Sequence, residues 1–245
     1  MGEKVIEFVD VIKRFEGRAV LDGLSFAVER GEVGIALQHS GDEVFTVLGP
    51  SGTGKSVTLK HIVGLEEPDS GEVRVADARV GYLFQSGALI AWKTVWENVA
   101  LPLVETTRLT DAEIERRVAS ALEAVGLLDA ADRYPAELSG GMQKRAGLAR
   151  AIVRDAEIVL YDEPTSGLDP VTSAVIERLI VDLNRSRGVT SVVVTHDLAM
   201  AARTSSRIML IKDGKSVACL PPDEFMRCGK REVAEFVGAA KGEET

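Results

Sequence analysis

Apolar and polar residues alternate along the first part of the chain, whereas later apolar runs are continuous, and the two patterns predict two kinds of strand. Alternation over Lys4–Asp10 and Leu24–Glu29 is typical of strands with one exposed face. Continuous runs such as Ile158–Tyr161 are typical of parallel strands covered on both faces. The predicted strands are Lys4–Asp10, Leu24–Glu29, Val44–Leu48, Glu72–Val75, Val80–Phe84, Ile158–Tyr161 and Ser191–Thr195.

Segments whose apolar residues recur at helical spacing separate these strands. Short and long helical segments are predicted over Ser56–Val63 and from Val171 to about Arg187, and the whole stretch from Thr94 to about Arg154 has a helical pattern. Within that stretch, Thr110–Glu113 is a capping box, which marks the start of a helix. Its apolar positions repeat at helical spacing: Ile114, Val118, Leu122 and Val125. Helices between parallel strands predict an α/β core with a helical insertion.

Composition excludes several classes of protein. Of the 245 residues 45% are hydrophobic, which is enough for a substantial core, and the net charge of −9 disfavours a nucleic-acid partner. No apolar stretch approaches the roughly 20 residues that span a bilayer, and the first residues lack the apolar segment of a signal peptide. Cys219 and Cys228 lie at no metal-ligand spacing, so reduced thiols in a cytosolic protein are expected.

A glycine-rich loop lies between the predicted strand Val44–Leu48 and the predicted helix that starts at Ser56. It consists of Gly49, Pro50, Ser51, Gly52, Thr53, Gly54, Lys55 and Ser56. Strand, G-x-x-x-x-G-K-S and helix together are the phosphate-binding loop, in which backbone N–H groups surround phosphate oxygens. Lys55 can reach the outer phosphates of ATP, and the Ser56 hydroxyl can bind Mg²⁺. The alternative is an ordinary glycine-rich turn.

The candidate ligands of this loop end at Ser56. A threonine at position 57 would add another hydroxyl group beside the phosphates, but the residue there is Val57, so no cofactor contact is assigned to it.

Two adjacent carboxylates end the apolar strand Ile158–Tyr161. Asp162 is expected to hold Mg²⁺ through water, facing Ser56. Glu163 is then the candidate group that polarises the attacking water. A solvated turn at the end of a strand is the alternative interpretation.

A second candidate anion site lies in Leu138–Met142. Ser139 can cap a helix here, while Gly140 and Gly141 leave backbone N–H groups accessible at the positive helix end. Taken alone, this segment is equally consistent with a simple capped helix start.

In this order, the motifs resemble those of the ATP-binding subunits of ABC transporters. The resemblance covers Phe15 to about Gly214 and includes Ser166–Asp169 besides the motifs above. It implies a head-to-tail homodimer in which each ATP lies between the phosphate loop of one copy and the Ser139 helix start of the other. This arrangement would explain why one chain carries two anion sites.

The resemblance also implies roles for single residues. Phe15 would stack on adenine, and Gln85 would contact Mg²⁺ and the attacking water and report to the membrane partner. Asp169 would communicate across the dimer, and His196 would contact the γ-phosphate. For Phe15 a place in the packed core is the alternative, and for His196 a packed or capping role.

The implied fold is an α/β P-loop NTPase of ABC type. Its RecA-like core carries an antiparallel β-subdomain and a helical subdomain that contains the second anion site. Within a single domain over 1–245, the core and β-subdomain would take up 1–85 and 155–220, the helical subdomain 86–154 and a C-terminal helical tail 221–245.

The residues within these motifs are most similar to those of the Mla-type ATPases, which serve lipid transporters with MCE-domain proteins. Phe84–Leu89, Thr94–Leu103 and Ser139–Ala151 carry this likeness, and Met142 stands where many importers have glutamine. The expected partners are a second copy, transmembrane permease subunits and an MCE-domain protein, at the cytoplasmic face of the inner membrane. A generic ABC solute importer is the alternative; a non-transport ABC ATPase or an inactive regulatory module fits less well.

The chain departs from the family pattern in two places. Residues 32–44 read as an added hairpin, and the stretch Ala76–Val80 is short. Two further segments leave alternatives open. Trp92 and Trp96 either dock the permease or pack the helical subdomain. The tail from Asp223 is a regulatory or dimer-stabilising element, or only a terminal helix with a frayed end.

Overall fold

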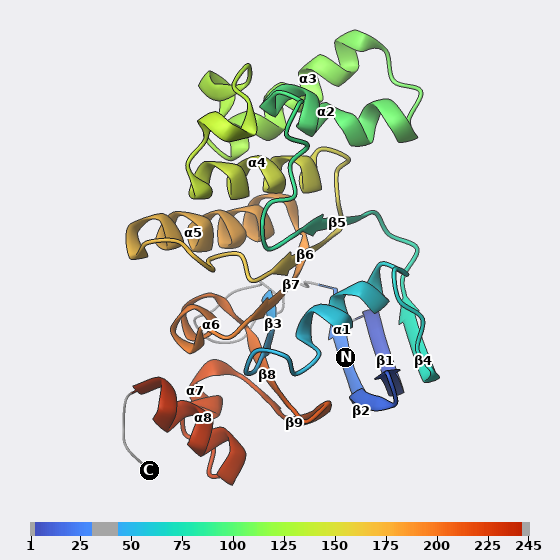
Figure 1. The fold of residues 1–245 in the computed structure, drawn as a ribbon, viewed down its shortest axis with the longest axis vertical. Helices are drawn as coiled ribbons and strands as arrows, with labels where there is room; N and C mark the ends of the chain where they lie inside the picture. The colour runs from blue at the N-terminus through green and yellow to red at the C-terminus, as the bar shows by residue number, and fades with distance from the viewer. Residues whose placement is uncertain (1–2, 31–43, 242–245) are drawn as a thin grey trace. The chain divides into compact units, whose positions relative to one another are not determined.

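The computed structural model describes residues 3–30 and 44–241 (Figure 1). Its contacts divide the chain into two compact units, one formed by Met1–Asp77 and Asn184–Thr245 and the other by Ala78–Leu183. The hairpin predicted at residues 32–44 falls outside the described residues, except for Val44, which begins a strand.

In the first unit, β1 (Lys4–Phe15), β2 (Arg18–Glu29) and β4 (Ser70–Val75) form an antiparallel sheet in the order β2-β1-β4. Strands β1 and β2 are longer than predicted, because the two-residue turn Glu16–Gly17 joins them directly. Both turn residues have positive φ, 50° and 80°, as in the tight turns whose twist matches that of paired strands. This turn places Phe15 at the tip of the hairpin.

The same unit contains a second group of strands: β7 (Thr190–Thr195), β3 (Val44–Leu48), β8 (Arg207–Lys212) and β9 (Lys215–Leu220), in that order. Strand β3 is parallel to both β7 and β8, and all of its residues are buried. The prediction of a buried strand at Val44–Leu48 is therefore confirmed. Helix α1 (Lys55–Ile62) follows it after a loop of six residues, 49–54.

The sequence patterns did not reveal β8, β9 or the helix at Leu198–Thr204, whereas a helical tail over 221–245 was expected. The turn between β8 and β9 is Asp213–Gly214, again with positive φ at both residues, 50° and 74°. Helices α6 (Leu198–Thr204), α7 (Pro222–Phe225) and α8 (Arg231–Lys241) complete the unit. Phe225 and Val233 are fully buried and pack in one cluster with Leu48 of β3, so the described part of the tail is a packed terminal helix.

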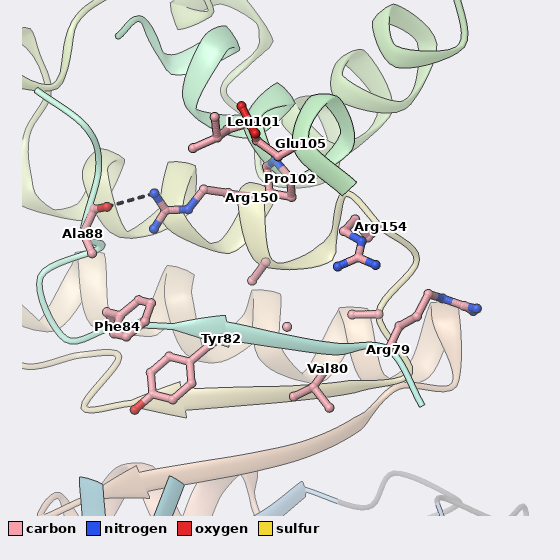
Figure 2. A pocket seen from close by; sticks show the side chains of 13 residues that line it. Arg79, Val80, Tyr82, Phe84, Ala88, Leu101, Pro102, Glu105, Arg150 and Arg154 are labelled. Carbon is pink, nitrogen blue, oxygen red and sulfur yellow. Dashed lines mark hydrogen bonds between the residues drawn. The ribbon is translucent and has the colours of Figure 1, made fainter. Parts of the chain in front are cut away.

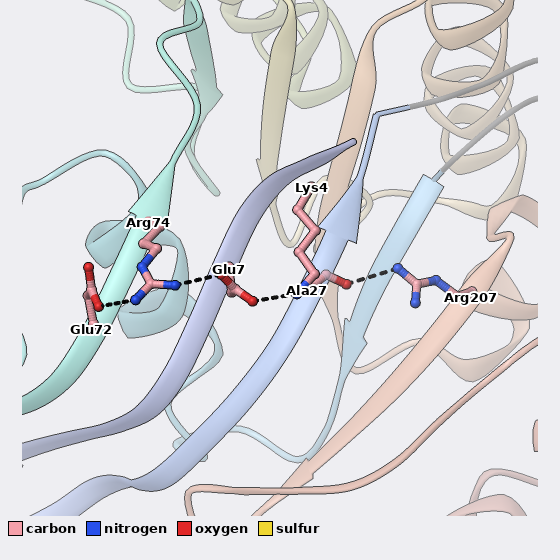
Figure 3. A network of polar contacts seen from close by, with 6 residues as sticks. All are labelled: Lys4, Glu7, Ala27, Glu72, Arg74 and Arg207. Carbon is pink, nitrogen blue, oxygen red and sulfur yellow. Dashed lines mark hydrogen bonds and ion pairs between the residues drawn. The ribbon is translucent and has the colours of Figure 1, made fainter. Parts of the chain in front are cut away.

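A chain of polar contacts crosses the surface of the antiparallel sheet (Figure 3). Arg74 of β4 pairs with Glu72 at 2.6 Å and with Glu7 of β1 at 3.1 Å, and Glu7 also pairs with Lys4. Such exposed pairs contribute little to stability, because solvent screens them. They therefore add little to the stability of the pairing between β1 and β4.

The second unit contains the parallel strands β5 (Val80–Leu83) and β6 (Ile158–Asp162), and four α-helices begin in it. They are α2 (Val95–Thr106), α3 (Asp111–Ala124), α4 (Gly140–Ile152) and α5 (Pro170–Arg187). The helical pattern predicted from Thr94 to Arg154 thus corresponds to three α-helices with 3-10 turns at Leu128–Ala130 and Pro135–Glu137 between α3 and α4. The capping box at Thr110 is confirmed, and Thr94 forms another. Among the described helices, none is both long enough and apolar enough to cross a membrane.

Candidate functional site

The glycine-rich loop follows the buried strand β3 and has the backbone shape that its glycines allow. Gly52 and Gly54 have φ of 81° and 91°, in the left-handed region that favours glycine. A Cβ on Gly54 would lie 2.9 Å from the Val20 carbonyl oxygen and 2.8 Å from a Leu21 methyl group. Gly54 is therefore required for two reasons, conformation and space, and an ordinary surface turn would require only the first.

Lys55 is held inside this loop. Its side chain is 5% exposed, and Nζ donates hydrogen bonds to the carbonyl oxygens of Gly49 and Pro50, both at 2.8 Å. Ser56 is half-buried at the next position, in the first turn of α1, and Thr53 Oγ1 donates to Pro50 O at 2.9 Å. A confined ammonium group beside the N–H groups of a helix start fits the phosphates of ATP, and the adjacent hydroxyl fits Mg²⁺.

Position 57 adds no ligand to this loop. The residue there is Val57, not threonine, and its aliphatic side chain has no hydroxyl group for a phosphate or for Mg²⁺. Its polar contribution is made by the backbone, since the Val57 carbonyl oxygen lies 2.7 Å from His61 Nδ1 in the next turn of α1. Val57 therefore belongs to the helix that carries the site and not to the set of candidate ligands.

Two glycine substitutions distinguish the cost of a strained backbone conformation from the cost of a steric clash in this loop. Gly52→Ala is expected to lower the free energy of unfolding by about 1–2 kcal/mol, the strain of a left-handed residue. Among the described residues, nothing lies within 4 Å of the position that its Cβ would take. Gly54→Ala should cost about 1–3 kcal/mol more, because the added methyl group overpacks against Val20. Urea unfolding of both variants measures the difference. Equal costs for the two variants would contradict the close approach at Gly54.

The other two predicted site residues of the first unit are accessible. Phe15 is 40% exposed and lies under the Lys13 ammonium group, which is 5.3 Å from the ring centroid. His196 is exposed directly after β7, and the next residue, Asp197, caps α6. The alternatives of a packed Phe15 or a packed or capping His196 are therefore wrong. Their contacts with adenine and the γ-phosphate remain predictions.

In the second unit, the two carboxylates lie at the end of β6. Asp162 and Glu163 are each 8% exposed, so the alternative of a solvated turn is wrong. Glu163 has a φ of 47°, an uncommon conformation for a residue with a side chain and one that is frequent at functional sites. The Lys144 ammonium group of α4 donates to Glu163 O at 3.0 Å and to Ser166 O at 2.7 Å. Burial lowers the pKa of Lys144, and the charge of Glu163 partly opposes this. Lys144 thus fixes the backbone that carries Glu163.

The second candidate anion site has the predicted helix cap. Ser139 Oγ accepts a hydrogen bond from Met142 N at 3.3 Å at the start of α4. Gly140 is exposed, whereas Gly141 is buried against Thr172 so closely that a Cβ would collide with its methyl group. Asp169 in turn accepts a hydrogen bond from Thr172 N at 3.0 Å, and the Thr172 hydroxyl lowers the pKa of its carboxyl group. The cap is confirmed, and the anion site remains a prediction.

Gln85 lies in a loop that α4 holds in place. Its Nε2 donates to Ser166 Oγ at 3.5 Å, which brings Gln85 beside the segment that follows Glu163. Arg150 of α4 donates to Gly87 O at 2.9 Å and Ala88 O at 2.8 Å, the second of which Figure 2 shows as a dashed line. In this unit, therefore, α4 positions both the Gln85 loop and the Glu163 loop.

Sequence reasoning missed Lys144, Arg150 and Tyr82 as parts of this site. Tyr82 Oη donates to Asp162 Oδ2 at 3.2 Å. The only sequence signal for Tyr82 was alternation along β5, which places it on the same face as Phe84. Lys144 and Arg150 are charged residues in the apolar surroundings of an otherwise well-packed helix, which is a weak signal of a structural role.

The fold and the loop geometry define a P-loop nucleotide-binding domain. The chain belongs to the ABC transporter family, whose model, described as "ABC transporter", matches residues 21–166. The match confirms the predicted ABC-type P-loop fold, with ATP and Mg²⁺ as the expected cofactors.

Similar proteins include three ATP-binding proteins of bacterial transporters. The methionine import protein MetN of Caulobacter vibrioides is 38% identical and aligns with 98% of this chain and 74% of its own length. MetN of Rhizobium etli is 37% identical over 88% of this chain. The chain spans only about 61% of the length of that relative. The probable ribonucleotide transport protein mkl of Mycobacterium leprae is 41% identical over 89% of this chain and 67% of its own.

Two solved structures are similar over most of the chain. One is a dimeric post-hydrolysis state of the ATP-binding cassette MJ0796 bound to ADP and Pi, with a TM-score of 0.77, 31% identity and coverage of 89% of this chain and 98% of that one. The other is CbiO1 from Clostridium perfringens, with a TM-score of 0.81, 25% identity and coverage of 97% and 95%. The names of the relatives do not support the finer Mla/MCE assignment and fit the alternative, a solute importer, better.

Proposed function

We propose that this chain is the ATP-hydrolysing subunit of an ABC importer, located peripherally at the cytoplasmic face of the inner membrane. The observation that carries the proposal is the confined Lys55 in a loop whose Gly54 has no room for a side chain. This geometry fits a phosphate chain held by backbone N–H groups. Phosphate release by the purified full chain, with and without Mg²⁺, tests the proposal. No Mg²⁺-dependent release by the chain, alone or with its permease, would contradict it.

In the proposed reaction, ATP supplies the phosphoryl group and Mg²⁺ neutralises its developing charge. Lys55 would bind the outer phosphates. Ser56 and Asp162 would hold the metal, with Gln85 as a further contact. Glu163 accepts a hydrogen bond from the attacking water and orients it. Its buried position and the Lys144 contact to its backbone support this role, because a positioned carboxylate loses little entropy in the reaction.

The proposed functional form is a head-to-tail homodimer. The phosphate loop of each copy would face the Ser139 helix start of the other, where Gly140 is exposed. The dimeric, ADP- and Pi-bound form of MJ0796 supports this arrangement by similarity. Association of two copies would then depend on nucleotide, because the bound nucleotide would contact both sites.

Methionine or another small solute is the cargo class that the names of the MetN relatives favour. Lipid transport with an MCE-domain protein is the second candidate, and the Mla-like wording of Phe84–Leu89 and Ser139–Ala151 supports it. The two are distinguished by purifying the chain with its permease and measuring ATP hydrolysis in lipid vesicles. Stimulation by a solute-loaded binding protein supports the importer, and stimulation by an MCE-domain protein supports lipid transport.

The permease is proposed to dock beside the segment that follows Gln85. Trp92 is 78% exposed, and Trp96 lines a cavity of about 560 Å³ with an apolar lining that includes Leu101, Val104 and Ile114. Four carboxylates and one lysine also line this cavity: Glu97, Glu105, Asp111, Glu115 and Lys93. An apolar hollow with this charge fits a cytoplasmic helix of the permease that carries basic residues.

Changing Trp92 and Trp96 together to alanine is expected to weaken assembly with the permease by about tenfold or more, because tryptophans at interfaces are frequent hot spots. Co-purification from detergent-solubilised membranes measures the effect. Tyr134→Ala, which removes a 47% exposed aromatic ring elsewhere in the same unit, is the matched control. Undiminished assembly of the double variant would rule out this docking surface.

A further inference from the structure

Tyr82 lies in β5, and its polar atom reaches the candidate metal site. Its hydroxyl group donates a hydrogen bond to Asp162 Oδ2 at 3.2 Å, across 80 residues of sequence. Strands β5 and β6 are parallel neighbours, with Leu83 opposite Tyr161, and this register brings Tyr82 next to the carboxyl end of β6. The contact therefore follows from the register of two strands of the same unit.

The ring of Tyr82 is held in a defined position. It stacks on Phe84, with ring centroids 4.2 Å apart and an interplanar angle of 27°. Figure 2 shows the two rings side by side, with the Tyr82 hydroxyl pointing away from Arg150 and Arg154. Stacking of this kind restricts rotation of the ring, so the hydroxyl group is aimed at Asp162 before any ligand binds.

A tyrosine hydroxyl group is an uncharged hydrogen-bond donor. A neutral donor orients a carboxylate without cancelling its charge, and the carboxylate keeps its attraction for a cation.

We propose that Tyr82 is a positioning residue that orients the Asp162 carboxylate for Mg²⁺ during ATP hydrolysis. The proposal rests on the proposed function, in which Asp162 serves the metal. Hydrogen-bond partners of metal-binding carboxylates fix the orientation of the ligand, and losing one weakens metal affinity or activity. Tyr82 acts through Asp162 and is not itself a catalytic residue.

The hydroxyl group of Tyr82 can be removed without disturbing the packing of its ring. Its ring lines a cavity of about 490 Å³ that is also lined by Leu101, Pro102 and Arg150 (Figure 2). Phenylalanine keeps the ring and its stacking on Phe84 and removes only the hydroxyl oxygen. Tyr82→Phe should therefore fold like the natural chain.

The experiment compares Tyr82→Phe with the unchanged full chain. The Mg²⁺ concentration for half-maximal ATP hydrolysis should rise about tenfold, the lower end of the effect expected for such hydrogen-bond partners. ATP binding in EDTA and the thermal midpoint should stay unchanged, because neither involves the metal. Tyr134→Phe, at an exposed tyrosine of the same unit, is the matched control and should change none of the three measurements.

Asp162→Asn distinguishes failure of this inference from failure of the proposed function. If Asp162→Asn shifts the Mg²⁺ dependence and Tyr82→Phe does not, Tyr82 has no positioning role and the proposed function stands. If Asp162→Asn leaves the Mg²⁺ dependence unchanged, the assignment of Asp162 to the metal is wrong, and the inference about Tyr82 fails with it. If Tyr82→Phe weakens ATP binding in EDTA as much as it raises the Mg²⁺ concentration for half-maximal hydrolysis, the role of Tyr82 is purely structural and the proposal is wrong.

Discussion

Glu163→Gln is expected to reduce ATP hydrolysis by about 10²–10⁴-fold, the contribution of a general base, while ATP continues to bind. Glutamine has nearly the shape of glutamate but cannot accept the proton of the attacking water. The backbone at Glu163, with its left-handed φ and its bond to Lys144, is unaffected by this change. The variant should therefore retain the fold and the nucleotide site.

The same variant is expected to accumulate as an ATP-bound dimer, because hydrolysis would no longer remove the bridging γ-phosphate. Single-turnover phosphate release and size-exclusion chromatography with Mg²⁺ and ATP measure the two effects. Glu123→Gln, an exposed residue of α3, is the control for loss of one negative charge in the same unit. Turnover by Glu163→Gln at the rate of the natural chain would show that another group orients the water.

Lys55→Ala is expected to weaken ATP binding by about tenfold to a hundredfold, the usual contribution of a hydrogen bond to a charged group. The ammonium group is 5% exposed and already confined by two loop carbonyls, so little ordering is needed when it meets a phosphate. Affinity should fall more for ATP than for AMP, because Lys55 is placed to reach the outer phosphates. Titration with a fluorescent ATP analogue, with ATP and AMP as competitors, measures both affinities.

Lys60→Ala is the matched control for this measurement, since Lys60 is an exposed lysine of the same helix. A thermal unfolding scan shows whether Lys55→Ala retains its fold. A folded Lys55→Ala protein with unchanged ATP affinity would contradict the assigned role of the loop.

Local signals predicted much of the fold. Strand β3 has the predicted bounds, because a continuous apolar run between turns is sufficient to define a doubly covered strand. The caps at Thr110 and Ser139 were predictable because a cap is satisfied within three residues. The hairpin β8–β9 was missed although its Asp213–Gly214 turn is a recognisable signal. Helices α7 and α8 lie within the helical tail that the family resemblance led us to expect over 221–245.

The assignment to a subfamily shows a second limit of prediction from sequence. Motif wording suggested lipid transport, whereas the names of the similar proteins concern methionine import and ribonucleotide transport. The motifs describe ATP chemistry, which transporters of many cargoes share. In the proposed transporter, cargo selection would depend on partner proteins, so the residues of this chain carry little information about it.

By itself, the sequence determined the phosphate loop, the adjacent carboxylates after β6 and the capped start of α4, because each depends on neighbouring residues. Only the tertiary structure decided that Glu163 is buried, that Lys144 holds its backbone and that Tyr82 reaches Asp162. The Lys144 and Tyr82 contacts join residues 19 and 80 positions apart. Strand pairing and helix packing create such contacts, and each brings together segments that are far apart in the sequence.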